Sequence, residues 1–159
     1  MKREEKETVR NLLIESYIQY QDFFEQDRWE KYLEEVKTAV DNEQIDALLI
    51  AKSGDTILGT VQLFPSSDLA YDEPTLHIEH PIIRFLAVHP DGRGLGIASK
   101  LLDRSIDYAR WNKAKAISLH TTDIMEKAVT LYERYGFKRD EVNDYLKSGT
   151  PIHCYTFSL

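Results

Sequence analysis

The segment from residue 82 to residue 102, IIRFLAVHPDGRGLGIASKLL, decides the fold class of this chain. It opens with an apolar run that predicts a buried strand ending at Val88, turns, and passes three glycines before a helical pattern begins. Glycines let the backbone come close to a ligand. The first N–H groups of a helix have no partner inside the helix, and the helix dipole adds positive potential there. The segment therefore predicts an anion site suited to a pyrophosphate, with Arg93 as a fixed charge beside it.

Other interpretations of the glycines fit less well. A P-loop needs Lys-Ser/Thr after its glycines, and no such pair follows Gly96. The dinucleotide fingerprint needs a third small residue, a place that Ser99 could take, but Asp123, the candidate ribose acid, lies ~27 residues beyond Gly96 rather than ~20. A dinucleotide-dependent oxidoreductase is therefore a distant alternative. The purely structural interpretation is a strand–turn–helix corner that binds no ligand.

Hydrophobic periodicity on both sides of this segment predicts alternating helices and strands. Asp27 and Glu30 form a candidate capping box for the second helix. The order predicts an α/β fold with a mixed sheet rather than a parallel one. The expected helices are 5–21, 28–42, 94–111 and 124–135, and the expected strands are 45–52, 56–64, 76–88, 137–141, 152–157 and 116–121, with a polar loop at 65–74.

Length and composition indicate one domain over residues 1–159. Hydrophobic residues make up 42% of the chain, enough for a core. The lone cysteine, Cys154, suggests a reducing compartment and is expected to be a small buried apolar residue. No apolar run is long enough for a membrane span, and the N-terminus lacks a signal-peptide pattern. We therefore expect a cytoplasmic protein without a membrane partner.

Charge is unevenly distributed along the chain. The net charge of −7 argues against nucleic acid as a partner. Residues 1–81 carry 8 Lys/Arg against 18 Asp/Glu, a balance of −10, whereas residues 82–139 carry 11 against 6, a balance of +5. One interpretation is solvated surface charge, and the other is that the basic segment binds an anion while the acidic one attracts a cation.

Two motifs resemble those of a known family. Arg93-Gly94-Leu95-Gly96-Ile97-Ala98 resembles the R/Q-x-x-G-x-G/A signature of the GNAT superfamily of acetyl-CoA-dependent N-acetyltransferases. Ala128-Val129-Thr130-Leu131-Tyr132 followed by Tyr135-Gly136-Phe137 resembles its A-x-x-L-Y-x-x-x-G-F segment. The resemblance implies a mixed, mostly antiparallel central sheet flanked by helices and splayed open at the acetyl-CoA site.

The resemblance also implies an activity: transfer of an acetyl group from acetyl-CoA, as cosubstrate, to a primary amine by direct attack, with no metal. A backbone N–H near Val88 would hold the acetyl oxygen, and Tyr132 would be the acid for the departing thiolate. Glu79 is the favoured base, with His80, His120 and water as alternatives. The implied acetyl-CoA contacts are Leu86, Ala87, Val88, Arg93, Gly94, Leu95, Gly96, Ile97, Ala98, Ser99, Ala128 and Tyr132.

Three departures accompany the resemblance. The short strand that usually opens the family's fold is short or missing, Met125 stands where an Asn often precedes the second motif, and Ile82 stands where many members have Glu. The missing Asn and Glu favour an alternative function, a non-catalytic acyl-CoA-binding module.

The charge split predicts a small cationic amine as acceptor, attracted by the carboxylates of Asp68, Asp72 and Glu73 in the loop 65–74. In this family the first helices and that loop generally wall the acceptor side. The sequence leaves open whether the chain forms a homodimer.

Overall fold

The computed structural model describes residues 2–159, so Met1 lies outside the described part of the expected domain. The chain divides into two compact units, each built from several stretches of sequence. The single domain over 1–159 stays a prediction. The first unit comprises the chain up to Glu43, Leu48–Val61 and Phe85–Leu101, and the second comprises Gln44–Ala47, Gln62–Arg84 and Leu102–Leu159.

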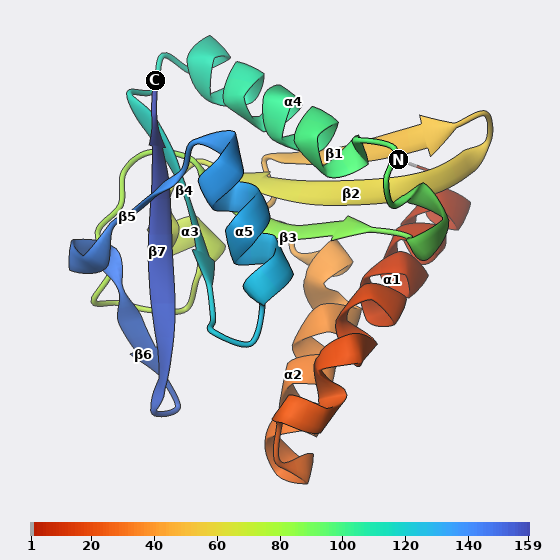
Figure 1. Ribbon diagram of the computed structural model, residues 1–159, viewed down its shortest axis with the longest axis horizontal. Helices are drawn as coiled ribbons and strands as arrows, with labels where there is room; N and C mark the ends of the chain where they lie inside the picture. Colours follow the sequence, from red (N-terminus) through yellow and green to blue (C-terminus); the bar gives the residue numbers. More distant parts are fainter. Residues whose placement is uncertain (1) are drawn as a thin grey trace. The chain divides into compact units, whose positions relative to one another are not determined.

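Within residues 2–159, seven strands form one open sheet with the order β1-β2-β3-β4-β7-β5, and β6 pairs with β7. β3 runs parallel to β4, whereas β4, β5 and β6 are all antiparallel to β7, which lies between β4 and β5 (Figure 1). The mixed, mostly antiparallel sheet confirms the expected fold class. The strands are β1 Ala47–Ser53, β2 Thr56–Phe64, β3 Ile82–Val88, β4 Ala116–Thr121, β5 Lys138–Arg139, β6 Tyr145–Lys147 and β7 Thr150–Ser158.

In the first unit, helices α1 (Arg3–Tyr17) and α2 (Gln26–Thr38) lie side by side (Figure 1). Their apolar faces share a core with residues of β1, β2 and β3. Short 3-10 turns follow both helices, at Ile18–Phe23 and Ala39–Asp41, so the expected helices 5–21 and 28–42 each end earlier than predicted. The buried members of this core are Val9, Leu12, Leu13, Val36, Ala39, Val40, Ile57 and Ala87.

The predicted capping box is wrong. The N-cap of α2 is Glu25, without a side-chain cap, so Asp27 lies inside the first turn. A carboxylate there still interacts favourably with the helix dipole. Glu30 does not reach back to the backbone, and instead accepts a hydrogen bond of 3.0 Å from the side-chain amide of Gln26.

In the second unit, β4 pairs along its whole length with β7, and Ile117, Ser118 and Leu119 are buried. Helix α4 (Ile97–Trp111) begins in the first unit and continues into the second, and α5 (Glu126–Tyr135) follows β4. The Tyr135 hydroxyl donates a hydrogen bond of 2.6 Å to Asp103 of α4. No helix within residues 2–159 is both long and apolar enough to cross a membrane.

The strand expected over 76–88 begins only at Ile82. Pro81 has no N–H to contribute to a strand ladder. The preceding segment instead hydrogen-bonds to a short helix, α3 (Ser67–Ala70), which lies in the expected loop 65–74. Ile78 accepts from the Ser67 N–H and donates to the Ser67 hydroxyl, both at 2.9 Å.

Strand β6 was not expected from the sequence. It pairs with β7 through a two-residue turn at Ser148 and Gly149, both with positive φ, 52° and 81°. Turns of this kind suit tight hairpins. The expected strand 137–141 is reduced to Lys138–Arg139, whereas the expected 152–157 extends to Thr150–Ser158.

Candidate functional site

The glycine-rich loop is seated on β2 by close packing. Ile97, the first residue of α4, lies against two glycines, so an added Cβ at Gly59 or Gly92 would come within 2.8 Å of its side chain. The His89 N–H donates to the Leu58 carbonyl oxygen at 2.8 Å. The start of α4 is therefore held where only glycine fits beneath it.

We expect Gly92→Ala to destabilise the fold by about 1–3 kcal/mol, because its Cβ would overpack the site. The contact at 2.8 Å is with Ile97 Cδ1, which Ile97→Val removes. In an Ile97→Val background the cost of Gly92→Ala should therefore be smaller, as urea unfolding can measure. Equal costs in both backgrounds would contradict this account of the packing.

The loop itself exposes a row of backbone donors. Gly94 and Gly96 have φ of +78° and +73°, and an added Cβ at either would meet no atom of the described residues within 4 Å. The first helical bond runs from the Lys100 N–H to the Gly96 oxygen at 3.1 Å. The N–H groups ahead of it, of Ile97, Ala98 and Ser99, have no acceptor within the part of the chain that the structure describes. These donors can hold an anion.

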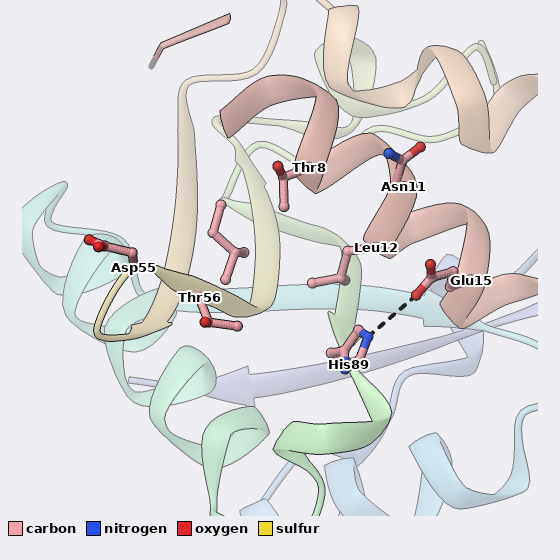
Figure 2. Close-up of a pocket in the computed structure, with 8 residues that line it drawn as sticks. Thr8, Asn11, Leu12, Glu15, Asp55, Thr56 and His89 are labelled. Carbon is pink, nitrogen blue, oxygen red and sulfur yellow. Dashed lines mark ion pairs between the residues drawn. The ribbon is translucent and has the colours of Figure 1, made fainter. Parts of the chain in front are cut away.

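Side chains around the loop add charge and order. Arg93 is exposed, and its charge acts on Tyr20. Burial raises the pKa of Tyr20, and the positive charge of Arg93 opposes that rise. His89 Nδ1 accepts the Asp91 N–H at 3.1 Å. Its Nε2 faces Glu15 of α1 at 3.4 Å (Figure 2). His89 thus connects the start of the loop to α1.

The pocket in Figure 2 belongs to the first unit and has a volume of about 300 Å³. It lies between α1 and the turn that joins β1 to β2. Its lining is part apolar and part polar, and the residues are Thr8, Asn11, Leu12, Glu15, Asp55, Thr56, Ile57 and His89.

The strand that the sequence predicts to be buried up to Val88 is buried only in part. Ala87 is 5% exposed, but Leu86 and Val88 are half-buried. Phe85 has φ of 51°, which is unusual for a residue other than glycine. Such strain is common where a backbone is shaped for function.

Tyr132 belongs to the second unit and is 8% exposed, the buried residue of α5. Its ring meets Phe137 edge-on, with the centroids 6.0 Å apart. Its carbonyl oxygen accepts the N–H groups of Gly136 and Phe137 at the end of the helix. Ala128, one turn earlier, is half-buried. The structure thus places Ala128 and Tyr132 of the second motif on one helix, which belongs to a different unit from the glycine-rich loop.

The three candidate bases have different surroundings. Glu79 is exposed, and no hydrogen bond or ion pair joins its carboxylate to another described residue. His80 Nε2 lies 2.6 Å from the Ser118 hydroxyl. His120 has both ring nitrogens engaged, with Tyr71 and with Asn143. Burial lowers the pKa of both histidines.

His80 ends a chain of hydrogen bonds across β4 and β7. The Ser118 hydroxyl lies 2.7 Å from the Thr156 hydroxyl, which donates to Asp140 at 2.9 Å. Cys154 is buried nearby, as expected, and burial raises the pKa of its thiol to about 12.

The loop carboxylates are not equivalent. Asp68 accepts from the Ser66 hydroxyl, and Glu73 accepts from the Thr75 hydroxyl at 2.6 Å. Asp72 is exposed, and its carboxylate makes no hydrogen bond or ion pair within residues 2–159.

A cluster around His120 was not predicted as a whole. Tyr71 comes from the loop after α3, Arg84 from β3 and Tyr145 from β6. One signal was present in the sequence, since Arg84 interrupts the otherwise apolar run IIRFLAV. Over residues 2–159, no group of three or more His, Cys, Asp or Glu side chains is arranged to hold a metal ion.

Comparisons with known proteins point to one family. The model of the acetyltransferase (GNAT) family matches residues 7–137. The probable N-acetyltransferase camello of Xenopus tropicalis is 37% identical over 107 residues, 67% of this chain and 44% of that protein. The uncharacterized N-acetyltransferase YhfO of Bacillus subtilis is 30% identical over 105 residues, 66% of each chain. The chain thus matches less than half the length of the first of these relatives.

A solved structure shares the fold. The PaiA N-acetyltransferase from Thermoplasma acidophilum, in complex with coenzyme A, matches with a TM-score of 0.70 over 99% of this chain and 96% of that one. Its sequence identity is 15%, so the likeness concerns the fold alone.

Proposed function

The chain belongs to the acetyltransferase (GNAT) family, and from that premise we propose that it moves an acetyl group from acetyl-CoA to a primary amine. The observation that carries the proposal is the row of backbone N–H groups from Ile97 to Ser99, which have no acceptor among the described residues and follow two glycines with positive φ. Such a row suits a pyrophosphate.

The loop Arg93–Ser99 is proposed to bind the pyrophosphate of acetyl-CoA mainly through backbone N–H groups. Leu86, Ala87 and Val88 would pair with the pantetheine arm at a splayed edge of β3, and a backbone N–H near Val88 would donate to the acetyl oxygen. The unusual φ of Phe85, directly before these residues, supports a special backbone course there. A donor placed in this way stabilises the oxyanion that forms during attack.

The amine would attack the thioester carbonyl directly, without an intermediate bound to the protein. Cys154 is an unsuitable nucleophile, because burial raises the pKa of its thiol to about 12. The Tyr132 hydroxyl is proposed to donate to the departing thiolate, with Ala128 beside the same arm. Glu79 stays a candidate for the base, with His80, His120 and water.

A panel of primary amines mixed with acetyl-CoA tests the function, with release of the coenzyme A thiol as the readout. Release that depends on an amine, together with an N-acetylated product by mass spectrometry, would support acetyl transfer. Binding of acetyl-CoA without release for any amine would support the acyl-CoA-binding module instead. Absence of acetyl-CoA binding would contradict both.

The acceptor is proposed to be a small cationic amine, attracted by the acidic residues 1–81. We expect kcat/KM for such an amine to fall as salt rises, because salt screens the attraction. Asp72→Asn should weaken that dependence, since the Asp72 carboxylate is exposed and makes no hydrogen bond to another described residue. Asp72→Glu is the matched control, because it keeps the negative charge at the same exposed position and should leave the salt dependence unchanged. Faster turnover of acidic than of cationic amines would contradict the proposal.

A further inference from the structure

Tyr71 and His120, in the second unit, form a hydrogen-bonded pair whose proton positions follow from its partners. His120 Nε2 lies 2.9 Å from the carbonyl oxygen of Asn143, and Nδ1 lies 3.0 Å from the Tyr71 hydroxyl. A carbonyl oxygen only accepts hydrogen bonds, so Nε2 carries the proton in the neutral ring. Nδ1 therefore accepts, and the Tyr71 hydroxyl donates to it.

Packing holds this pair in place. The Tyr71 and His120 rings meet at 86° with centroids 4.9 Å apart, and the Tyr145 ring lies 5.2 Å from that of His120. The Arg84 guanidinium lies 4.8 Å from the centre of the Tyr71 ring and donates to the Ala70 carbonyl oxygen at 2.6 Å. Tyr71 is thus fixed by a cation on its face and by the aromatic rings of His120 and Tyr145.

Burial keeps the His120 ring neutral, so that it can take up a proton. Burial lowers the pKa of His120, and the charge of Arg84 lowers it further. The Asn143 carbonyl, Asp144 and Asp140 act in the other direction and would stabilise an imidazolium once it forms.

Tyr71 is a weak acid by itself. Burial raises the pKa of Tyr71, and Tyr145, Cys154 and Tyr132 add to the rise, whereas Arg84 opposes it. Tyr71 would therefore give up its proton only as another arrives on the same oxygen. The contribution of Tyr132 means that the proposed acid lies within electrostatic reach of Tyr71.

We propose that Tyr71 and His120 together accept the proton of the acceptor amine, an inference that rests on the proposed function. As the amine nitrogen bonds to the carbonyl carbon, its N–H proton moves to the Tyr71 oxygen, and the Tyr71 proton moves to His120 Nδ1. The electron pair of the broken N–H bond stays on nitrogen. Tyr71 ends neutral, and His120 ends as an imidazolium that still donates through Nε2 to Asn143.

Three variants test the pair with the most active amine of the panel: Tyr71→Phe, His120→Asn and both together. Each single change should lower kcat about 100-fold, as loss of general base catalysis does. The double variant should be no slower than the worse single one, because the two residues act as a unit. Affinity for acetyl-CoA should stay within twofold. Tyr145→Phe, which keeps the ring that packs on His120, is the control and should stay within threefold of wild type.

The pH profile separates this role from a structural one. In the wild type, kcat should fall as the pH falls through the lowered pKa of His120, because an imidazolium cannot accept the proton. His120→Asn should remove this acid limb. Tyr71→Phe within threefold of wild type, an acid limb that persists in His120→Asn, or losses that multiply in the double variant would each overturn the inference.

Two further outcomes keep the inference testable. If the wild type releases no thiol with any amine, the proposed function fails and this inference fails with it. If the wild type is active and Tyr71→Phe is equally active, only the inference fails. If the variants do not fold, ¹⁵N NMR of the wild type decides. The Nε2–H tautomer of His120 is expected, and an Nδ1–H tautomer would overturn the pair.

Discussion

Replacing Gly96 with valine is expected to abolish coenzyme A binding while the chain still folds. Gly96 has φ of +73°, and no atom of residues 2–159 lies within 4 Å of an added Cβ, so the side chain would point into open space. In the proposed complex, the pyrophosphate occupies that space. A branched side chain there would exclude the phosphate oxygens from the N–H groups that follow.

The backbone also contributes, because a residue other than glycine at positive φ costs roughly 1–2 kcal/mol. Gly149→Val is the matched control, since Gly149 has φ of +81°, equally open surroundings and a place in the β6–β7 turn. Both variants should lose similar stability in urea. Only Gly96→Val should lose affinity for coenzyme A by calorimetry, and an unchanged dissociation constant would remove the loop from the site.

Local pattern was sufficient for some elements and insufficient for others. Strands β2 and β4 were predicted with the bounds that the structure shows, 56–64 and 116–121. Both are rich in apolar residues, and a clear turn precedes each of them. Residues 76–81 look like a strand locally, yet they hydrogen-bond to Ser67 of a helix that periodicity did not predict. Tertiary contacts therefore overrode the pattern there.

The candidate site shows the same division. The glycine loop is local, so its residues and their exposed donors could be predicted from one segment of sequence. The pair at His120 is not local, since Tyr71, Arg84 and Tyr145 come from three other elements. Their sequence spacing carries no periodic signal, and only the fold brings them together. For this reason the sequence favoured Glu79 as base and offered His120 only as an alternative, whereas the proposed partner of His120, Tyr71, emerges only from the fold.

Tyr132→Phe is expected to lower kcat about 100-fold and to leave acetyl-CoA affinity within twofold. Tyr132 is 8% exposed and packs edge-on against Phe137, contacts that a phenylalanine ring keeps. The change therefore removes the hydroxyl proposed to meet the departing thiolate. A phenol titrates near ~10 and a thiol near ~8.5, so a full proton transfer is uphill by about 2 kcal/mol. The hydroxyl then acts chiefly as a hydrogen-bond donor that stabilises the developing charge.

Tyr135→Phe is the matched control on the same helix. It removes a hydroxyl that donates to Asp103 at 2.6 Å, so it should lower stability and leave kcat nearly unchanged. Steady-state kinetics and thermal unfolding of both variants separate the two roles. If Tyr132→Phe keeps kcat within twofold of wild type, a change worth only ~0.4 kcal/mol, then Tyr132 is a core residue and the thiolate is protonated by another group.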